Sequence, residues 1–152
     1  MWNTLFFLIA ALVVAADQLS KIWIRANIPI GQALFEAGFF RLIHITNSGA
    51  AFGLFRGYSS VFTVSALVAF VVFLLYVFVI YRKYPSFDNV SNRIAIGMMF
   101  GGTAGNLIDR LRFGVVTDFI DLSFWPTFNI ADSSVTIGVI LFVYSILFIS
   151  RR

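Results

Sequence analysis

Polar side chains that could carry out a reaction are concentrated between Gly101 and Asp132 of an otherwise apolar chain. Four of the seven acidic residues lie in this segment, at Asp109, Asp118, Asp121 and Asp132. Two carboxyl groups in a poorly solvated place cannot both ionise cheaply, so one keeps its proton and the pair titrates as a unit. One member can then activate water while the other protonates a leaving group. The segment is therefore a candidate site for acid-base hydrolysis.

The first part of this segment has the spacing of a helix. Three glycines recur at every fourth residue, at Gly97, Gly101 and Gly105. Such a row predicts a flat helix face against which a neighbouring backbone can pack closely. Asp109 continues the row, while Gly102, Asn106 and Arg110 follow the same spacing beside it. We expect this face to point into protein, with Arg110 paired to Asp109 because an unpaired charge there would be costly.

After Gly114 the pattern changes to the alternation of a strand. It places Asp118 on one face together with apolar residues, and Asp121 on the other face, where we expect it to be solvated. Asp132 follows Asn129, which has the position of a helix N-cap. By local pattern alone, the simpler interpretations are favoured: Asp118 as an exposed loop acid, and Asp132 as a first-turn acid stabilised by the helix dipole.

The composition indicates one integral membrane domain over residues 1–152. The chain is 60% hydrophobic and only 12% charged, whereas a soluble domain is about a quarter charged. It has no cysteine and a single histidine, His44, so it cannot form a histidine and cysteine zinc site by itself. We expect no metal and no other cofactor. The net charge of +4 comes from scattered basic residues beside hydrophobic segments, which favours membrane lipids rather than nucleic acid as the partner.

The hydrophobic pattern predicts an all-α membrane protein with four transmembrane helices, at about residues 2–24, 61–81, 93–112 and 130–149. Residues 25–60 are too polar to span, and we expect a small extracytoplasmic cap that contains β-structure. The short turn between the second and third helices carries Arg82, Lys83 and Arg93. By the positive-inside rule this turn and both termini are cytoplasmic. Asp109 then lies about 24 Å along the helix from Arg93, near the outer boundary.

Two further polar groups precede the central segment. Asp17 and Lys21 are four residues apart, in the favourable order for an ion pair on one helix; an interfacial salt bridge with Lys21 reaching toward water is an equally good interpretation. Asn47 lies in an Asn-Ser-Gly turn after a stretch rich in β-branched and aromatic residues. The residues alone suit a turn asparagine that tolerates a left-handed backbone as well as they suit any functional role for Asn47.

Five blocks of the chain resemble the signal peptidase II family, the membrane-embedded aspartyl proteases that trim bacterial prolipoproteins. The blocks are DQLSK at 17–21, NSGAAFG at 47–53, GGTAGNLIDR at 101–110, GVVTDF at 114–119 and FNIAD at 128–132. They occur in the family's order and extend from the first hydrophobic segment to the last. Small residues are common in membrane helices, so the glycine-rich block alone would be a weak signal; five ordered blocks are a strong one.

The resemblance implies that Asp118 and Asp132 are the catalytic pair. It also implies a substrate-binding or supporting role for eight other residues: Asp17, Lys21, Asn47, Gly102, Asn106, Asp109, Arg110 and Asn129. The implied substrate is a prolipoprotein carrying a diacylglyceryl-modified cysteine, cut just before that cysteine. The implied location is the bacterial cytoplasmic membrane, with the site near its outer face, and we expect a monomer.

Two other classes of protein remain open on the residues alone. Intramembrane Asp and Arg residues also mark the pathways of proton- or ion-coupled transporters, although four short helices without an inverted repeat are few for alternating access. The glycine row also suits a noncatalytic assembly subunit, which would tolerate asparagine at Asp118 and Asp132. A Ser-Lys protease is disfavoured, because Ser20 and Lys21 are neighbours and cannot face each other on a helix.

Overall fold

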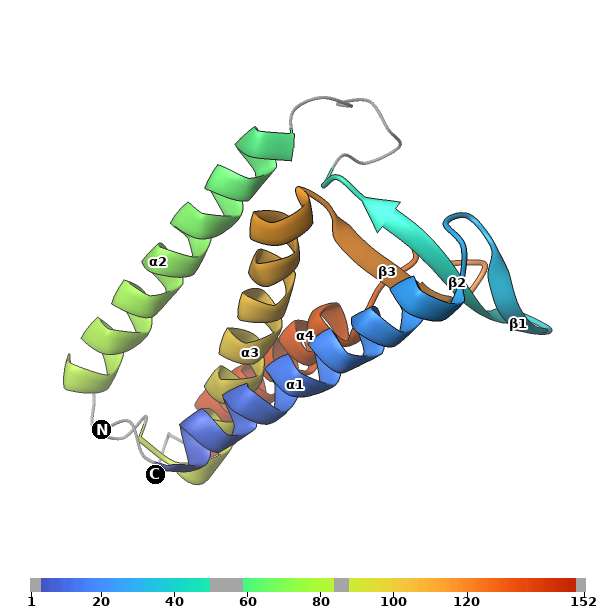
Figure 1. Ribbon diagram of the computed structural model, residues 1–152. Coiled ribbons are helices and arrows are strands. Elements are labelled where there is room, and N and C mark those ends of the chain that lie inside the picture. The colour runs from blue at the N-terminus through green and yellow to red at the C-terminus, as the bar shows by residue number, and fades with distance from the viewer. Residues whose placement is uncertain (1–3, 50–58, 84–87, 150–152) are drawn as a thin grey trace.

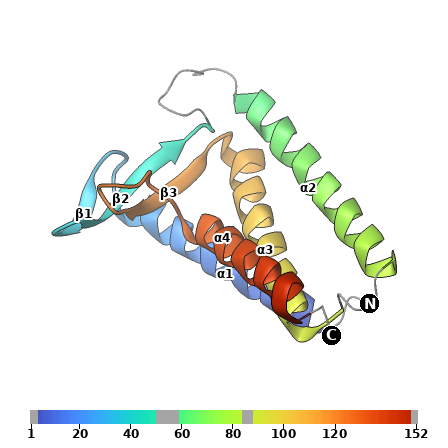
Figure 2. The ribbon, with the colours of Figure 1, turned by 180° about the vertical axis from the view of Figure 1, so that it is seen from behind.

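The computed structural model describes residues 4–49, 59–83 and 88–149, which form helices and one small sheet (Figure 1). The elements in chain order are α1 (Thr4–Asn27), β1 (Ala33–Ala37), β2 (Phe40–Asn47), α2 (Ser59–Lys83), α3 (Val90–Phe113), β3 (Val116–Asp121), α4 (Ile130–Tyr144) and η3 (Ser145–Ile149), a π-helix. Helices α1, α3 and α4 form the bundle, and α2 lies to one side, against α3 (Figure 2). The sheet lies at the end of the bundle where α1 ends and α4 begins.

Helix α3 contacts α1 and α4 through its glycines. A Cβ at Gly97 or Gly101 would lie 3.0 Å or 2.7 Å from a backbone oxygen of α1. A Cβ at Gly102 would instead collide with the carbonyl oxygen of Ala131 in α4. Because side chains are missing at these positions, the three helix backbones approach one another closely, as small residues allow in membrane bundles. The prediction of a close-packing glycine face is confirmed.

The turn from α3 into β3 depends on Gly114. This residue follows the last turn of α3 with a φ of 73°, and its N–H donates to the Arg110 carbonyl. A left-handed residue at this position ends a helix and is readily supplied by glycine. The chain then enters β3 at Val116 within two residues. This short connection fixes Asp118 close to the end of α3.

The sheet has the strand order β1-β2-β3 and is antiparallel throughout. Strands β1 and β2 form a hairpin around Gly38, and β2 pairs with β3 so that Ile45 lies opposite Asp118. A small apolar core joins the sheet to the bundle; its buried members are Ile24, Ile28 and Phe119. His44 is buried in β2 with its Nδ1 2.7 Å from the Ile28 carbonyl oxygen.

The observed helices are close to the predicted ones. The expected cap at 25–60 begins later, because α1 continues to Asn27, and its described part is the β1-β2 hairpin. The part of the predicted cap at 50–58 lies outside the described residues. By length and composition, α1 and Ile130–Phe148 are apolar enough to cross a membrane, and α2 contains a shorter apolar stretch, Thr63–Val77. Large aliphatic side chains such as Leu12, Val68 and Ile140 are exposed around the bundle, as expected for a lipid-facing surface.

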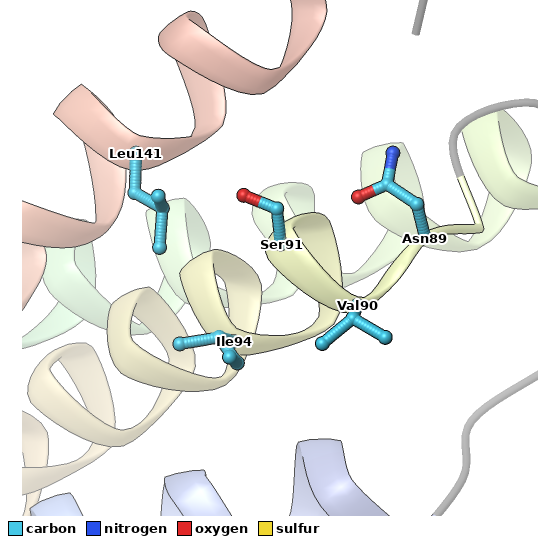
Figure 3. A pocket seen from close by; sticks show the side chains of 5 residues that line it. All are labelled: Asn89, Val90, Ser91, Ile94 and Leu141. Atoms are coloured by element: carbon cyan, nitrogen blue, oxygen red, sulfur yellow. The ribbon is translucent and has the colours of Figure 1, made fainter. Parts of the chain in front are cut away.

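A hollow of about 520 Å³ lies at the end of the bundle opposite the sheet. It is lined by Asn89, Val90, Ser91 and Ile94 of the α3 start and by Leu141 of α4 (Figure 3). None of these five side chains carries a charge. The candidate chemistry therefore lies elsewhere, at the sheet end of the bundle.

Candidate active site

Asp118 lies in the middle of β3, with its side chain only 2% exposed. Asn47, near the cross-strand partner of Asp118 at the end of β2, donates from Nδ2 to Asp118 Oδ2 over 2.9 Å. Asn129 Nδ2 donates to the other oxygen, Oδ1, over 2.7 Å. Both carboxyl oxygens are therefore paired with side-chain amides. The strand prediction is confirmed, and the alternative of an exposed loop acid is wrong for Asp118.

Asp132 lies in the first turn of α4, where it forms a capping box with Asn129. The Asp132 N–H donates to Asn129 Oδ1 over 2.9 Å, and the Asn129 N–H donates back to Asp132 Oδ2 over 3.2 Å. Such a reciprocal pair satisfies two backbone N–H groups that a helix start leaves free. The predicted N-cap at Asn129 is confirmed, and the cap fixes the direction of the Asp132 carboxyl.

Two asparagines connect the two carboxyl groups. Asn129 contacts Asp118 directly, and Asn106 Nδ2 of α3 donates to Asp132 Oδ1 over 2.7 Å. Asn129 Nδ2 also lies 3.1 Å from Asn106 Oδ1, so the four side chains form one continuous network. Burial raises the pKa of the Asp118 carboxyl to about 6, and the nearby Asp132 charge adds to the rise, against the hydrogen bonds from Asn47 and Asn129. The Asp132 charge therefore acts on the Asp118 carboxyl.

Lys21 of α1 lies beneath this network and is completely buried. Its Nζ is 2.8 Å from Asp17 Oδ2, 2.8 Å from Asn106 Oδ1 and 3.4 Å from Asp109 Oδ2. A buried ammonium needs such partners, since an unpaired charge in the interior is costly. The ion pair predicted between Asp17 and Lys21 is confirmed, and the alternative in which Lys21 reaches toward water is wrong.

Asp17 joins α1 to the start of α4. Its Oδ1 accepts the backbone N–H of Ala131 over 3.0 Å, so a carboxylate caps the positive end of α4. Room for Asp17 comes from Gly105, where a Cβ would lie 2.5 Å from Asp17 Oδ2. Asp17 therefore orients the helix turn that carries Asp132.

Asp109 joins α3 to β3 and α1. Its Oδ2 accepts the Thr117 N–H over 3.0 Å, which ties the strand beside Asp118 to the helix. Arg25 Nη1 lies 3.4 Å from Asp109 Oδ1 and donates to Thr117 Oγ1 over 2.9 Å. The expected pair between Asp109 and Arg110 is wrong, because adjacent helix residues point in different directions and Asp109 faces α1.

Arg110 instead lines a cavity of about 380 Å³ on the other side of α3. Asn106 and Asp132 line the same cavity, and Ala66 and Ala69 of α2 form its opposite wall. The remaining lining residues are Thr103, Val135 and Thr136. The cavity thus places open space beside one of the two candidate catalytic carboxyl groups.

Asp121 lies outside this network, although it is not solvated as expected. Its side chain is 8% exposed and forms an ion pair with Arg41, its cross-strand partner in β2. The Ser123 N–H donates to Asp121 Oδ1 over 2.9 Å and is the main cause that lowers the pKa of Asp121. The prediction was wrong because strand alternation gives the face of a residue but not what covers that face.

Sequence reasoning missed three polar side chains that support the site. Gln18 Nε2 lies 3.1 Å from Asp17 Oδ2 and 3.3 Å from Asp109 Oδ1, and Arg25 and Thr117 hold Asp109 as described above. Arg25 could have been found, since it is four residues after Lys21 and so shares its helix face. Across the described ranges, no group of three or more His, Cys, Asp or Glu residues could hold a metal ion.

The site holds two carboxyl groups beside an open cavity, and one of them is deeply buried. Amide groups donate hydrogen bonds to both. This is the arrangement of an aspartic hydrolase. The exposed aliphatic surface of the helices indicates that this hydrolase belongs to the membrane class.

Comparison with known proteins agrees with this class. Residues 9–148 match the family model described as signal peptidase II. A lipoprotein signal peptidase of Dehalococcoides mccartyi strain CBDB1 is 47% identical over 89% of this chain and 84% of its own length. That of Moorella thermoacetica is 44% identical over 93% of this chain and 92% of its own length. A bacterial membrane enzyme solved at 1.9 Å resolution superposes with a TM-score of 0.78 at 34% identity, covering 95% of this chain and 93% of that one.

The chain belongs to the signal peptidase II family of aspartic peptidases. Family membership bears out the resemblance carried by the five sequence blocks, and it disfavours the transporter and the noncatalytic subunit. Family membership does not by itself assign roles to individual residues.

Proposed function

We propose that this member of the signal peptidase II family uses Asp118 and Asp132 as its catalytic pair, and that it cuts diacylglyceryl-modified prolipoproteins just before the lipidated cysteine. The observation that supports the pair most strongly is the shared amide network, in which Asn129 contacts both aspartates. Because Asp118 is buried and the nearby Asp132 charge adds to the rise of its pKa, Asp118 keeps its proton to a higher pH than an ordinary aspartate.

The reaction needs one proton acceptor and one proton donor. The ionised carboxylate takes a proton from water as the water oxygen attacks the peptide carbonyl carbon, and the protonated carboxyl stabilises the carbonyl oxygen. When the carbon-nitrogen bond breaks, a proton passes to the leaving amine of the cysteine. Asn47, Asn106 and Asn129 orient the two carboxyl groups, while Lys21, Asp17 and Asp109 position the elements that bear them. Gly102 lets α4 approach α3.

We propose further that all four helices cross the bacterial cytoplasmic membrane as one monomeric domain with both termini in the cytoplasm. The short basic turn before α3 supports this orientation. Helix α1 begins and η3 ends at the bundle end opposite the sheet (Figure 1), so the carboxyl pair and the sheet lie near the outer face. Cysteine introduced at Ser123 should then react with reagents outside the cell, and cysteine at Ser86 only with reagents that reach the cytoplasm. The reverse labelling would overturn the orientation.

A site at the membrane boundary receives its peptide from the plane of the membrane. Each acyl methylene left in lipid contributes about 0.8 kcal/mol of anchoring, so a diacylglyceryl group fixes the depth of the bond to be cut. We expect cleavage of the lipid-modified precursor and little or none of the unmodified one. Equal rates on both precursors in the same detergent would contradict this use of the lipid.

The catalytic pair is tested by single substitutions in purified protein. Asp118→Asn and Asp132→Asn should each lower kcat/KM by about 10²- to 10⁴-fold, with thermal unfolding showing that the protein stays folded. Asp121→Asn is a matched control in the same strand, and it should keep near-normal turnover because Asp121 contacts Arg41 rather than the network. Near-normal turnover in either Asp118→Asn or Asp132→Asn would overturn the proposed pair.

A further inference from the structure

Arg25 lies in the last turn of α1 and contacts both sides of the turn that joins α3 to β3. Its guanidinium lies over the Phe113 ring, 4.6 Å from the ring centre, and its Nη1 donates to Thr117 Oγ1 over 2.9 Å. We propose that Arg25 is a positioning residue for Asp118, which follows Thr117 in β3. This inference rests on the proposed function and adds to it a residue of α1 that lies outside the five sequence blocks.

The turn between α3 and β3 needs a contact on each side to hold its angle. Phe113 is the last residue of α3 and β3 begins at Val116, so only two residues separate the helix from the strand. One of them, Gly114, has a φ of 73°. Glycine adopts many other backbone conformations as readily, so Gly114 by itself does not fix the direction of the strand. Arg25 holds the residue before Gly114 and the strand after it.

Thr117 is held through its backbone and its side chain, and it is only 3% exposed. Its N–H donates to Asp109 Oδ2 over 3.0 Å, and its carbonyl oxygen accepts from Asn129 Nδ2 over 3.3 Å. Its hydroxyl oxygen accepts from Arg25, so α1 holds the side chain while α3 and the N-cap of α4 hold the backbone. A shift of Thr117 would carry the adjacent Asp118 carboxyl with it.

An arginine suits this position better than a lysine would. A guanidinium is planar and can stack on an aromatic ring while its N–H groups donate to other acceptors. Arg25 makes both kinds of contact, and its Nη1 also lies 3.4 Å from Asp109 Oδ1. A lysine ammonium is a compact point charge, so it can replace the ion pair but not all three contacts. Lysine at this position should therefore restore only part of the function.

The buried Asp109 charge stays paired when Arg25 is removed. Lys21 Nζ lies 3.4 Å from Asp109 Oδ2, and Gln18 Nε2 lies 3.3 Å from Asp109 Oδ1. The Arg25 side chain is 21% exposed, and an ion pair open to water contributes less to stability than a buried one. The effect of Arg25 on catalysis can therefore be measured in folded protein.

The test measures kcat and KM separately for a lipid-modified precursor, with thermal unfolding in the same detergent. Arg25→Met should lower kcat by about 10- to 100-fold, because a misplacement of about 1 Å can lower the rate about 10²-fold. KM should stay within about twofold, because the described lining of the cavity beside Asp132 comes from α2, α3 and α4 rather than from α1. Arg25→Lys should recover part of the loss in kcat.

Arg112→Met is the matched control. The Arg112 guanidinium lies 5.5 Å from the centre of the same Phe113 ring, and within the described ranges it shares none of the hydrogen bonds of Arg25. It also belongs to α3, so it does not connect α1 to the strand. Arg112→Met should keep near-normal kcat.

A double-variant cycle tests the route through Thr117. Thr117→Val keeps a β-branched side chain and removes the hydroxyl that accepts from Arg25. Substitutions that break one shared contact are not additive. The double variant Arg25→Met, Thr117→Val should therefore have about the same kcat as Arg25→Met alone.

The outcomes separate this inference from the proposed function. An unchanged kcat in folded Arg25→Met would overturn the positioning role, and so would a raised KM with unchanged kcat, which would make Arg25 a substrate contact. Losses that multiply in the double variant would overturn the route through Thr117. If Arg25→Met fails to fold, an unchanged kcat in Thr117→Val overturns the inference instead. Failure of the proposed function would appear separately, as turnover that persists in Asp118→Asn.

Discussion

Replacing Gly102 by alanine should separate the effect of helix spacing on catalysis from its effect on stability. A Cβ at Gly102 would collide with the carbonyl oxygen of Ala131 and lie 2.9 Å from Val135 Cγ2. The Ala131 oxygen belongs to the backbone and cannot rotate away, so α4 must move away from α3 to restore ordinary contact, which begins at 3.4 Å. Ala131 immediately precedes Asp132, and the displacement therefore reaches the carboxyl group that Asn106 contacts from α3.

Two opposing effects set the change in stability. Overpacking costs about 1–3 kcal/mol, while alanine favours a helix over glycine by about 1 kcal/mol. The net loss in the free energy of unfolding is therefore about 0–2 kcal/mol, which leaves most molecules folded. Catalysis is more sensitive, since a misplacement of about 1 Å can lower the rate about 10²-fold. We expect kcat/KM to fall by about 10- to 100-fold.

Gly97→Ala provides the matched comparison. There a Cβ would lie 3.0 Å from Ile9 Cβ and from the Phe6 carbonyl oxygen, so the crowding is against α1 and away from the carboxyl pair. Cleavage of a lipid-modified precursor is measured for both variants, together with thermal unfolding in the same detergent. If Gly102→Ala cleaves as fast as Gly97→Ala at equal folded fraction, the spacing between α3 and α4 does not control the position of Asp132.

Three further predictions concern charge. Lys21→Met leaves the buried Asp17 charge without its partner and should cost about 3–5 kcal/mol of unfolding free energy; an unchanged Tm would contradict this. The pKa of Asp118 rises from 3.8 to about 6 on folding. Protonated Asp118 therefore contributes fully to the stability of the fold below pH 3.8, and this contribution is lost as the pH rises through about 6. The Tm should therefore fall over that range, and Asp118→Asn should flatten the dependence. Arg41→Ala breaks a pair whose Arg41 side chain is 40% exposed, and calorimetry should show a loss below about 1 kcal/mol.

Local spacing was sufficient to predict those parts of the site that depend on one element. The row of glycines that continues to Asp109 faces α1 as the spacing required, and Asn129 caps α4 because its side chain needs only the next helical turn. The same reasoning failed for the partner of Asp109, which is Lys21 of another helix. Spacing along a chain gives the direction of a side chain, but the group that it meets depends on how separate helices pack.

The sheet shows a similar division. Alternation placed Asp118 correctly in a strand, whereas the pairing of Asp121 with Arg41 required the register between β2 and β3. That register includes an irregularity between Leu42 and Ile45, which no pattern in either strand reveals. The substrate-side role of Asn47 stays a prediction, although its contact with Asp118 shows that the turn and the strand come together.

The contact between Asp17 and Ala131 joins residues 114 positions apart, and this has a consequence for biosynthesis. Helix α1 is made first, and its Asp17 and Lys21 neutralise each other within one helical turn, which lowers the cost of placing both charges in a membrane before other helices arrive. The start of α4, made last, then supplies the N–H group that Asp17 accepts. With Asp118 and Asp132 as the proposed catalytic pair, activity requires the final helix, which carries Asp132, so a partly synthesised chain should not cleave precursors in the same membrane.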